Sequence, residues 1–244
     1  MIARIVAAID LKPGDEAVEI GPGRGALTQR LLDAAGRLQT IEIDRDLAAM
    51  LRERYADQPG FVVHEADALT IDWAALAAAR GTQLRLIGNL PYNISTPLLF
   101  RLLDAAKVIL DMHFMLQKEV VDRIVAAPGS DAYGRLTVML APRVHATRLL
   151  DVGPGAFRPV PQVASSVVRM TVIAHPPDWA LSPMYGKVVL AAFGQRRKTL
   201  RNALSAYLTA PQIGAVGIDP GARAETLSPS QFGALALAAA AVLH

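Results

Sequence analysis

The chain has 244 residues, of which 52% are hydrophobic and 19% charged. That composition can build one large domain, or one domain with a small appendix, and it excludes a disordered protein. The absence of cysteine excludes disulfides, thiolate metal sites and cysteine nucleophiles. The net charge is +3, and it is unevenly spread: residues 1–100 carry 10 basic and 13 acidic side chains, residues 101–244 carry 15 and 9. The basic part favours a polyanionic partner, with a solvated basic face as the alternative.

The N-terminus lacks the apolar region of a secretory signal, and no apolar run reaches the length of a membrane span. We therefore expect a cytoplasmic protein with no membrane partner. The five histidines lack the spacing of metal ligands, so no metal is expected either.

Short apolar segments alternate with helical patterns through the first part of the chain. The expected strands cover 17–20, 38–43, 61–64, 84–87 and 108–116. The expected helices cover 26–35, 46–55, 73–80, 97–105 and 118–126. This alternation predicts an α/β fold with a mostly parallel sheet covered on both faces. Two later apolar stretches, 144–152 and 166–173, have little helix between them and are expected to pair antiparallel at the sheet edge.

The pattern changes at His175-Pro176-Pro177, beyond which helical segments are separated by prolines. These segments cover 183–193, 197–208, 211–216 and 230–243. We place a domain boundary at this point. The prediction is an α/β domain over 1–175 and a small all-α domain over 176–244.

The run Asn89-Leu90-Pro91-Tyr92 follows an apolar strand, where an open α/β sheet exposes its ligand crevice. An aromatic amine is a poor nucleophile, and two hydrogen-bond acceptors would draw its nitrogen toward tetrahedral geometry. The Asn89 side-chain carbonyl and the Leu90 backbone carbonyl are candidates for these acceptors. Pro91 fixes its own φ and donates no hydrogen bond, and Tyr92 offers a ring for stacking on a base. The alternative is an ordinary turn between a strand and a helix, with an Asn cap and a proline.

The glycine-rich segment Glu19–Gly25 follows the first expected strand and opens a helix, as expected of a cofactor loop. Gly21-x-Gly23-x-x-Ala26 also fits the dinucleotide fingerprint, with Glu42 as the acidic residue about 20 positions on. The glycines alone therefore leave nicotinamide and S-adenosylmethionine both open.

Three successive expected strands end in or near carboxylates: Glu19, Glu42 and Asp67. A carboxylate directly before the loop suits a cationic ligand better than a pyrophosphate, and Asp67 is placed to accept from an adenine amine. This repetition favours S-adenosylmethionine, although each acid alone also fits a helix N-cap or a first-turn charge.

The densest basic cluster consists of Arg196, Arg197, Lys198 and Arg201. We expect Arg197 and Arg201, four residues apart, to share one helical face and to contact phosphates. A solvated helix face is the alternative.

These motifs carry a resemblance to a known family. Segments 19–25, 41–44, 66–68 and 89–92 resemble the cofactor and catalytic motifs of S-adenosylmethionine-dependent RNA adenine N6-methyltransferases. With 157–165 and 192–204, they are similar to the bacterial small-subunit ribosomal RNA adenine N6,N6-dimethyltransferases, the kasugamycin-sensitivity family. Macrolide-resistance methyltransferases of the large subunit share the first domain, and the 194–204 block favours the small-subunit family over them.

The resemblance implies a Rossmann-like methyltransferase domain and a helical RNA-contacting domain. It implies dimethylation of two adjacent adenosines near the 3′ end of 16S rRNA in the immature small subunit, by a monomer using S-adenosylmethionine. The implied roles are methionine contact for Gly21 and its neighbours, ribose contact for Glu42, adenine contact for Asp67, cofactor and base contact for Asn89, and base stacking for Tyr92 and Phe157. Phe157 also fits a plain core position.

The sequence departs from the family in one respect, because Met1–Arg4 begins inside the helix that normally follows a Phe-Gly-Gln-Asn-Phe-Leu segment over the cofactor. We expect this to affect cofactor affinity. It also keeps open an RNA-binding assembly factor with weak or lost transferase activity, whereas the intact Asn89–Tyr92 run argues against loss. A nicotinamide enzyme is disfavoured because no Tyr-x-x-x-Lys set accompanies the crevice.

Overall fold

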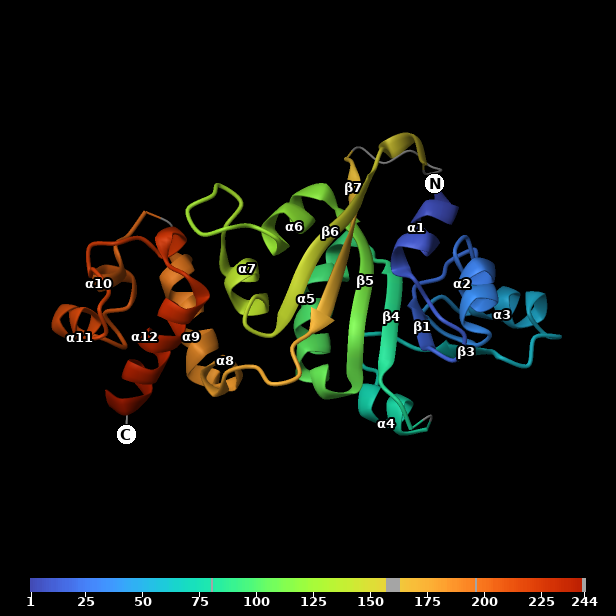
Figure 1. Cartoon of the computed structure of the whole chain (residues 1–244), viewed down its shortest axis with the longest axis horizontal. Helices are drawn as coiled ribbons and strands as arrows, with labels where there is room; N and C mark the ends of the chain where they lie inside the picture. The colour runs from blue at the N-terminus through green and yellow to red at the C-terminus, as the bar shows by residue number, and fades with distance from the viewer. Residues whose placement is uncertain (80, 157–162, 196, 243–244) are drawn as a thin grey trace. The chain divides into compact units, whose positions relative to one another are not determined.

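The structure is a computed structural model that describes residues 1–79, 81–156, 163–195 and 197–242, with the backbone alone at Tyr92, Asn93 and Ala156. The chain forms two compact units (Figure 1). Unit 1 comprises Met1–Val121 and Ala146–Val172, and unit 2 comprises Asp122–His145 and Ile173–His244. None of the helices in the described ranges is long and apolar enough to cross a lipid bilayer.

Unit 1 is built on a seven-stranded sheet with the order β3-β2-β1-β4-β5-β7-β6 (Figure 1). The strands are β1 Glu16–Ile20, β2 Leu38–Glu42, β3 Phe61–Glu65, β4 Leu84–Asn89, β5 Ile109–Gln117, β6 Val144–Val152 and β7 Ser165–Val172. Neighbours among β1 to β5 pair in parallel, and β7 runs antiparallel to β5. The mostly parallel sheet predicted from the sequence is confirmed, with the two later strands at its edge.

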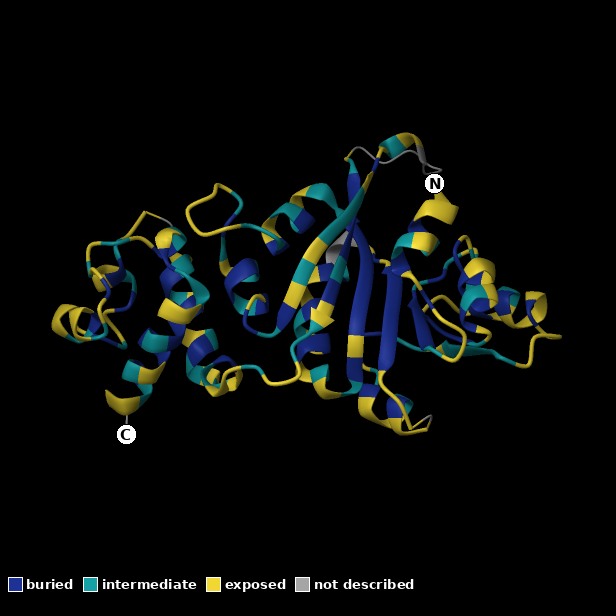
Figure 2. Cartoon of the chain, in the orientation of Figure 1, coloured by how far each residue is buried: buried dark blue, intermediate teal, exposed yellow. Residues whose placement is uncertain are grey.

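Helices cover both faces of this sheet because the parallel strands are connected by crossovers. They are α1 Ile2–Ile9, α2 Thr28–Ala35, α3 Arg45–Arg54, α4 Trp73–Ala78, α5 Tyr92–Asp104 and α6 Lys118–Ile124. The crossovers through α2 and α3 run toward β3, and those through α4 and α5 run in the opposite direction, toward β5. Right-handed connections therefore place the two pairs of helices on opposite faces. Figure 2 shows the result: β4 and β5 are buried along most of their length, whereas β6 is partly exposed.

The strand order reverses at β1, which has β2 on one side and β4 on the other. Open α/β sheets bind ligands at the carboxyl ends of their strands at such a reversal, because the two connecting loops diverge there. In this chain the loop after β1 carries the glycines and the turn after β4 carries Asn89. The fold thus places the two segments singled out in the sequence at neighbouring strand ends.

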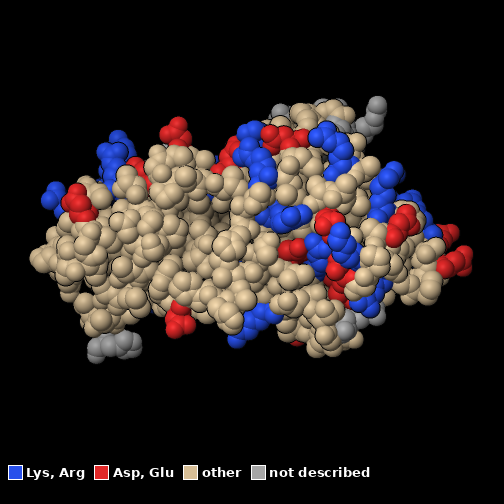
Figure 3. All heavy atoms as spheres, viewed as in Figure 1, with Lys and Arg blue, Asp and Glu red and all other residues tan. Residues whose placement is uncertain are grey.

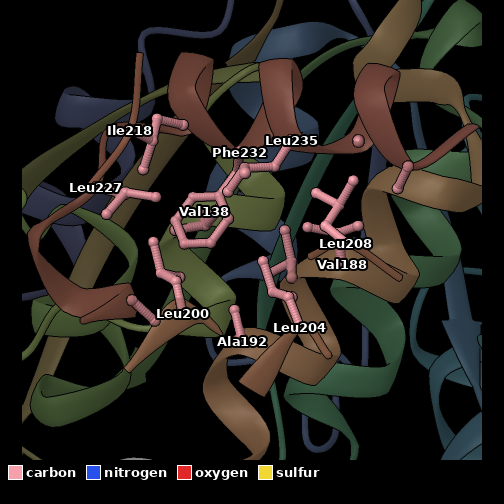
Figure 4. Packing of buried hydrophobic residues seen from close by; sticks show 14 of the residues in the cluster. Val138, Val188, Ala192, Leu200, Leu204, Leu208, Ile218, Leu227, Phe232 and Leu235 are labelled. Carbon is pink, nitrogen blue, oxygen red and sulfur yellow. The ribbon is translucent and has the colours of Figure 1, made fainter. Parts of the chain in front are cut away.

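Unit 2 is helical and has its own apolar core (Figure 4). Its further helices are α7 Arg135–Leu140, α8 Asp178–Leu181, α9 Pro183–Gly194, α10 Leu200–Ala203, α11 Ala210–Ala215 and α12 Pro229–Val242. The sequence placed residues 122–145 in the first domain, whereas the structure packs them in unit 2. The reason is visible in the contacts: Tyr133 donates to the Leu227 carbonyl at 2.7 Å, and Tyr185 donates to the Val138 carbonyl at 2.7 Å.

The helix expected over 197–208 is wrong in its bounds. Thr199 is extended, with φ −73° and ψ 159°, and the helix begins at Leu200. The Leu200 and Arg201 N–H groups donate to the carbonyls of Ala222 and Pro220, at 2.9 and 3.0 Å, so tertiary partners set the start of α10. Leu200 and Leu204 both lie in the core drawn in Figure 4.

Candidate active site

The glycine-rich loop after β1 depends on left-handed backbone conformations. Gly21 and Gly23 have φ of 65° and 55°, a region that disfavours residues with a Cβ. A Cβ at either position would meet no heavy atom within 4 Å, so conformation rather than crowding demands glycine. The Gly21 N–H donates to the Ile41 carbonyl at 2.9 Å, which ties the start of the loop to the end of β2.

Glu42, the last residue of β2, holds this loop from its other side. One carboxylate oxygen accepts from the Gly23 N–H at 3.0 Å, and the other accepts from the Asp44 N–H at 3.0 Å. Asp44 in turn caps α3 by accepting from the Asp46 and Leu47 N–H groups. Ile43, the residue between them in the chain, is 69% exposed and presents an apolar side chain just after β2.

Glu19 lies in β1 one residue before the strand ends, and its side chain is buried. The Thr28 hydroxyl, at the start of α2, donates to its carboxylate at 2.6 Å. Burial raises the pKa of Glu19 from 4.5 to about 7; the Thr28 hydrogen bond opposes this rise and the nearby Glu42 charge adds to it. A carboxylate whose charge is this poorly compensated would be stabilised by a bound cation.

Asp67 lies just beyond β3 in a tight turn. Its carboxylate accepts from the Leu69 N–H at 2.9 Å, and its backbone carbonyl accepts from the Thr70 N–H at 2.9 Å. This local bonding fixes the carboxylate at the same edge of the sheet as Glu42, because β2 and β3 pair in parallel through Glu42 and Glu65. Its predicted contact with an adenine amine stays a prediction.

Gly88, just before Asn89, packs closely against the backbone of β1. A Cβ at Gly88 would lie 2.6 Å from the Ile20 carbonyl oxygen, a distance that real Cβ atoms do not adopt. The adjacent Leu90 has a buried side chain, and its N–H donates to the Met115 carbonyl on β5 at 3.2 Å. Pro91 has φ −56° and ψ 140°, so the chain turns there and α5 begins at Tyr92.

Asn89 is exposed at the end of β4, next to this fixed peptide. The Cα register pairs Ile20 with Gly88 and Asn89 with Met115. Asn89, Leu90 and the glycine loop therefore lie at adjacent strand ends of unit 1. The sequence predicted this grouping. It did not single out Gly88 as a packing requirement, Thr28 as the partner of Glu19, or Ile43. Of these, only a glycine inside a strand pattern carried a signal.

The predicted RNA-contacting residues have a different placement. Arg197, Lys198 and Arg201 are exposed in unit 2, whereas Phe157, Arg196 and the Tyr92 side chain lie outside the described residues. The expected helical face shared by Arg197 and Arg201 is wrong, because Arg197 lies in a turn before α10. Figure 3 shows basic and acidic side chains intermixed on the visible face of unit 1. Within the described ranges, no three His, Cys, Asp or Glu side chains are grouped as a metal site.

Comparison with known proteins settles the family. The model of the ribosomal RNA adenine dimethylase family matches residues 1–240. The chain belongs to the ribosomal RNA adenine dimethylase family. Its relatives include the ribosomal RNA small subunit methyltransferase A of Methylococcus capsulatus, 53% identical over 95% of this chain and 90% of the relative. That of Aromatoleum aromaticum is 52% identical over 96% of this chain and 87% of the relative.

Solved structures show the same fold for this adenine dimethylase. A dimethyladenosine transferase from Plasmodium falciparum superposes with a TM-score of 0.79 at 24% identity, covering 96% of this chain and 93% of the other. The 23S rRNA methyltransferase ErmE superposes with a TM-score of 0.74 at 27% identity, covering 97% and 96%. The resemblance inferred from the sequence motifs and the Rossmann-like methyltransferase fold are both confirmed. The protein is an adenine dimethyltransferase rather than a nicotinamide-dependent enzyme.

Proposed function

We propose that this enzyme transfers methyl groups from S-adenosylmethionine to N6 of two adjacent adenosines near the 3′ end of small-subunit rRNA, dimethylating each. The observation that carries the proposal is the Asn89-Leu90-Pro91 turn, fixed against the end of β1 beside the glycine loop. Relatives named ribosomal RNA small subunit methyltransferase A, about half identical to this chain, support the choice of subunit.

The glycine loop and its carboxylates fit S-adenosylmethionine. When bound, this group supplies a methyl on a positively charged sulfur. Glu19 is a buried carboxylate two residues before Gly21, and a bound cation would oppose the rise of its pKa. Glu42 ends β2, where a ribose-binding acid belongs in this type of fold. The exposed Ile43 offers an apolar surface for the adenine ring, and Asp67 offers an oxygen to its amine.

The Asn89 turn activates and orients the target amine. The Asn89 side-chain carbonyl and the Leu90 backbone carbonyl each accept one N6 hydrogen, which draws the nitrogen lone pair out of the ring. The Leu90 N–H bonds to Met115, the Leu90 side chain is buried, and Pro91 fixes the backbone on the other side of the carbonyl, so the Leu90 carbonyl is oriented before the base arrives. Such pre-orientation supplies rate without reorganisation during the reaction.

With these two acceptors, the reaction needs no strong general base to remove a proton from N6 before the methyl is transferred. As the N6–carbon bond formed, the sulfur–methyl bond would break and the cofactor would leave as the neutral thioether. The nitrogen would become cationic and would lose its proton to water afterwards. A second round begins from a monomethylated amine with one remaining N–H, which either acceptor can bind. Tyr92 and Phe157 are proposed to stack on the two faces of the base, each stacking contact being worth about 1–3 kcal/mol.

The target adenosine must leave its stack to reach a crevice at the strand ends, which favours an RNA loop as substrate. Arg196, Arg197, Lys198 and Arg201 are proposed to contact backbone phosphates around that loop. We propose that the enzyme acts as a monomer in the cytoplasm on the immature small ribosomal subunit, without a metal, and that residues 176–244 of its helical unit contact the RNA.

The test is transfer of isotope-labelled methyl from S-adenosylmethionine to immature small subunits, followed by mapping of the modified nucleotides. The proposal expects label on two neighbouring adenosines near the 3′ end of the rRNA. Label on large-subunit rRNA instead would show that the substrate belongs to the large subunit. If the wild-type protein bound the RNA but transferred no label, it would be an assembly factor, and the proposal would be overturned.

A further inference from the structure

The C-terminal end of α1 is held by two arginines that reach it from the sheet. Arg169 on β7 donates to the Ala8 carbonyl at 2.6 Å. Arg85 on β4 donates to the Ile9 and Asp10 carbonyls, both at 3.1 Å. The last carbonyls of a helix lack partners within the helix and carry partial negative charge, so cationic donors stabilise them.

The two arginines are held differently. Arg85 is paired with buried Asp111 at 2.8 Å and with half-buried Asp15 at 2.6 Å, so removing it would leave a buried carboxylate without its partner. Arg169 instead donates through Nε to His113 Nε2 at 2.8 Å. Burial lowers the pKa of His113 to about 4, so the imidazole is neutral at physiological pH and can accept this bond. Arg169 can therefore be replaced without orphaning a buried charge.

The inner side of α1 supports both halves of the proposed active site. Ile5 and Ile9 are buried in one apolar cluster with Leu27 and Met115. Leu27 directly precedes Thr28, the residue that donates to Glu19, and so joins the glycine loop to α2. The Met115 carbonyl accepts from the Leu90 N–H and so fixes the peptide that joins Asn89 to Leu90, the two residues proposed to accept from the amine. A shift of α1 would loosen both segments at once.

We propose that Arg169 is a positioning residue for methyl transfer, which acts by clamping α1 against the cluster beneath the glycine loop and the Asn89 turn. The inference rests on the proposed cofactor site. In this proposal Arg169 touches neither cofactor nor base. Its guanidinium bridges His113 and the end of α1, and α1 transmits the constraint through Ile5 and Ile9. Its removal should therefore weaken cofactor binding as well as lower the overall stability.

The decisive variant is Arg169→Met, which keeps an unbranched apolar stem and removes the Nε and Nη2 donors. We expect the dissociation constant for S-adenosylmethionine, measured by titration calorimetry, to rise roughly fivefold to tenfold. We also expect faster hydrogen exchange at the Asp10 and Leu90 amides. Arg169→Lys keeps the charge but not the forked donor, and should weaken binding by about twofold to threefold.

The matched control is Arg37→Met. Arg37 pairs with buried Glu16 at 3.0 Å and donates to the Gly14 carbonyl at 2.6 Å, both outside α1. The Arg37→Met variant should be less stable than wild type, but its affinity for the cofactor and the hydrogen-exchange rate of its Leu90 amide should be unchanged. Wild-type affinity in both Arg169 variants, or an equal loss in Arg37→Met, would overturn the inference.

A double-mutant cycle tests whether the effect passes through α1. Ile5→Ala loosens the same helix, so combining it with Arg169→Met should weaken binding by less than the product of the single effects. A multiplicative result would contradict transmission through α1. If the wild-type protein itself failed to bind S-adenosylmethionine, the proposed function would fail. The exchange measurement would still decide whether Arg169 holds α1 and Leu90.

Discussion

Glu19 offers a prediction in which function and stability oppose each other. Its carboxyl is buried, and its pKa is raised from 4.5 to about 7. Between these values the unfolded chain has lost the proton and the folded chain has kept it. The folded state thus binds more protons in this window, and stability falls as the pH rises through it. At about 1.4 kcal/mol per pKa unit, the full cost above pH 7 is about 3 kcal/mol.

Glu19→Gln removes this cost, because the amide carries no charge and its oxygen can still accept from the Thr28 hydroxyl. At pH 5 the wild-type side chain is already mostly neutral in the folded state, so less than about 1 kcal/mol of the cost is present. The stability of the variant relative to wild type should therefore increase by about 2 kcal/mol from pH 5 to pH 8. All other titrating groups are common to both proteins and cancel in this comparison.

The assay is urea denaturation of both proteins without ligand at the two pH values, with the slopes compared to confirm a common unfolded state. The variant should also bind S-adenosylmethionine more weakly at pH 8, since it has lost the carboxylate that a cation would stabilise. If the stability difference between the variant and wild type stayed constant with pH, the raised pKa of the buried Glu19 carboxyl would be refuted. Tighter cofactor binding by the variant would refute the electrostatic role.

Three further predictions follow from single contacts. Gly88→Ala should lower the free energy of unfolding by about 2 kcal/mol, because its Cβ meets the Ile20 carbonyl; unchanged denaturant midpoints would contradict that close approach. Asp44→Ala removes the N-cap of α3 and should cost about 1 kcal/mol in the same assay, and no loss would mean that the cap is redundant. Arg201→Gln should weaken RNA binding at all sequences and reduce the slope of log affinity against log salt by about 1; an unchanged slope would exclude a phosphate contact.

The strand ends were predictable because their signals are local. A glycine cluster after an apolar strand requires positive φ, and Asn89-Leu90-Pro91 terminates another strand, so the sheet rule alone brings them to one edge. The helical face through Arg197 and Arg201 failed for the opposite reason. Local helix propensity continued the pattern, but the Leu200 N–H bonds to a carbonyl 22 residues later, Ala222. Sequence patterns do not register such a partner.

The anchoring of α1 was also beyond sequence reasoning. Arg85 donates to the Ile9 carbonyl across 76 residues, and Arg169 donates to the Ala8 carbonyl across 161. A lone arginine in an apolar strand is ambiguous from sequence, because only the sheet register shows that it faces Asp111 or His113. Tertiary pairing decides its role.

The central claim is that the Asn89 and Leu90 oxygens make the adenine amine reactive. The most direct test measures the single-turnover rate of methyl transfer to immature small subunits for wild type and Asn89→Ala. The RNA affinity of both proteins is measured alongside. We expect the Asn89→Ala rate to be lower by about a hundredfold to a thousandfold, with RNA binding nearly intact. A variant that transfers methyl at the wild-type rate would contradict it, as would one whose loss of rate is matched by its loss of RNA binding.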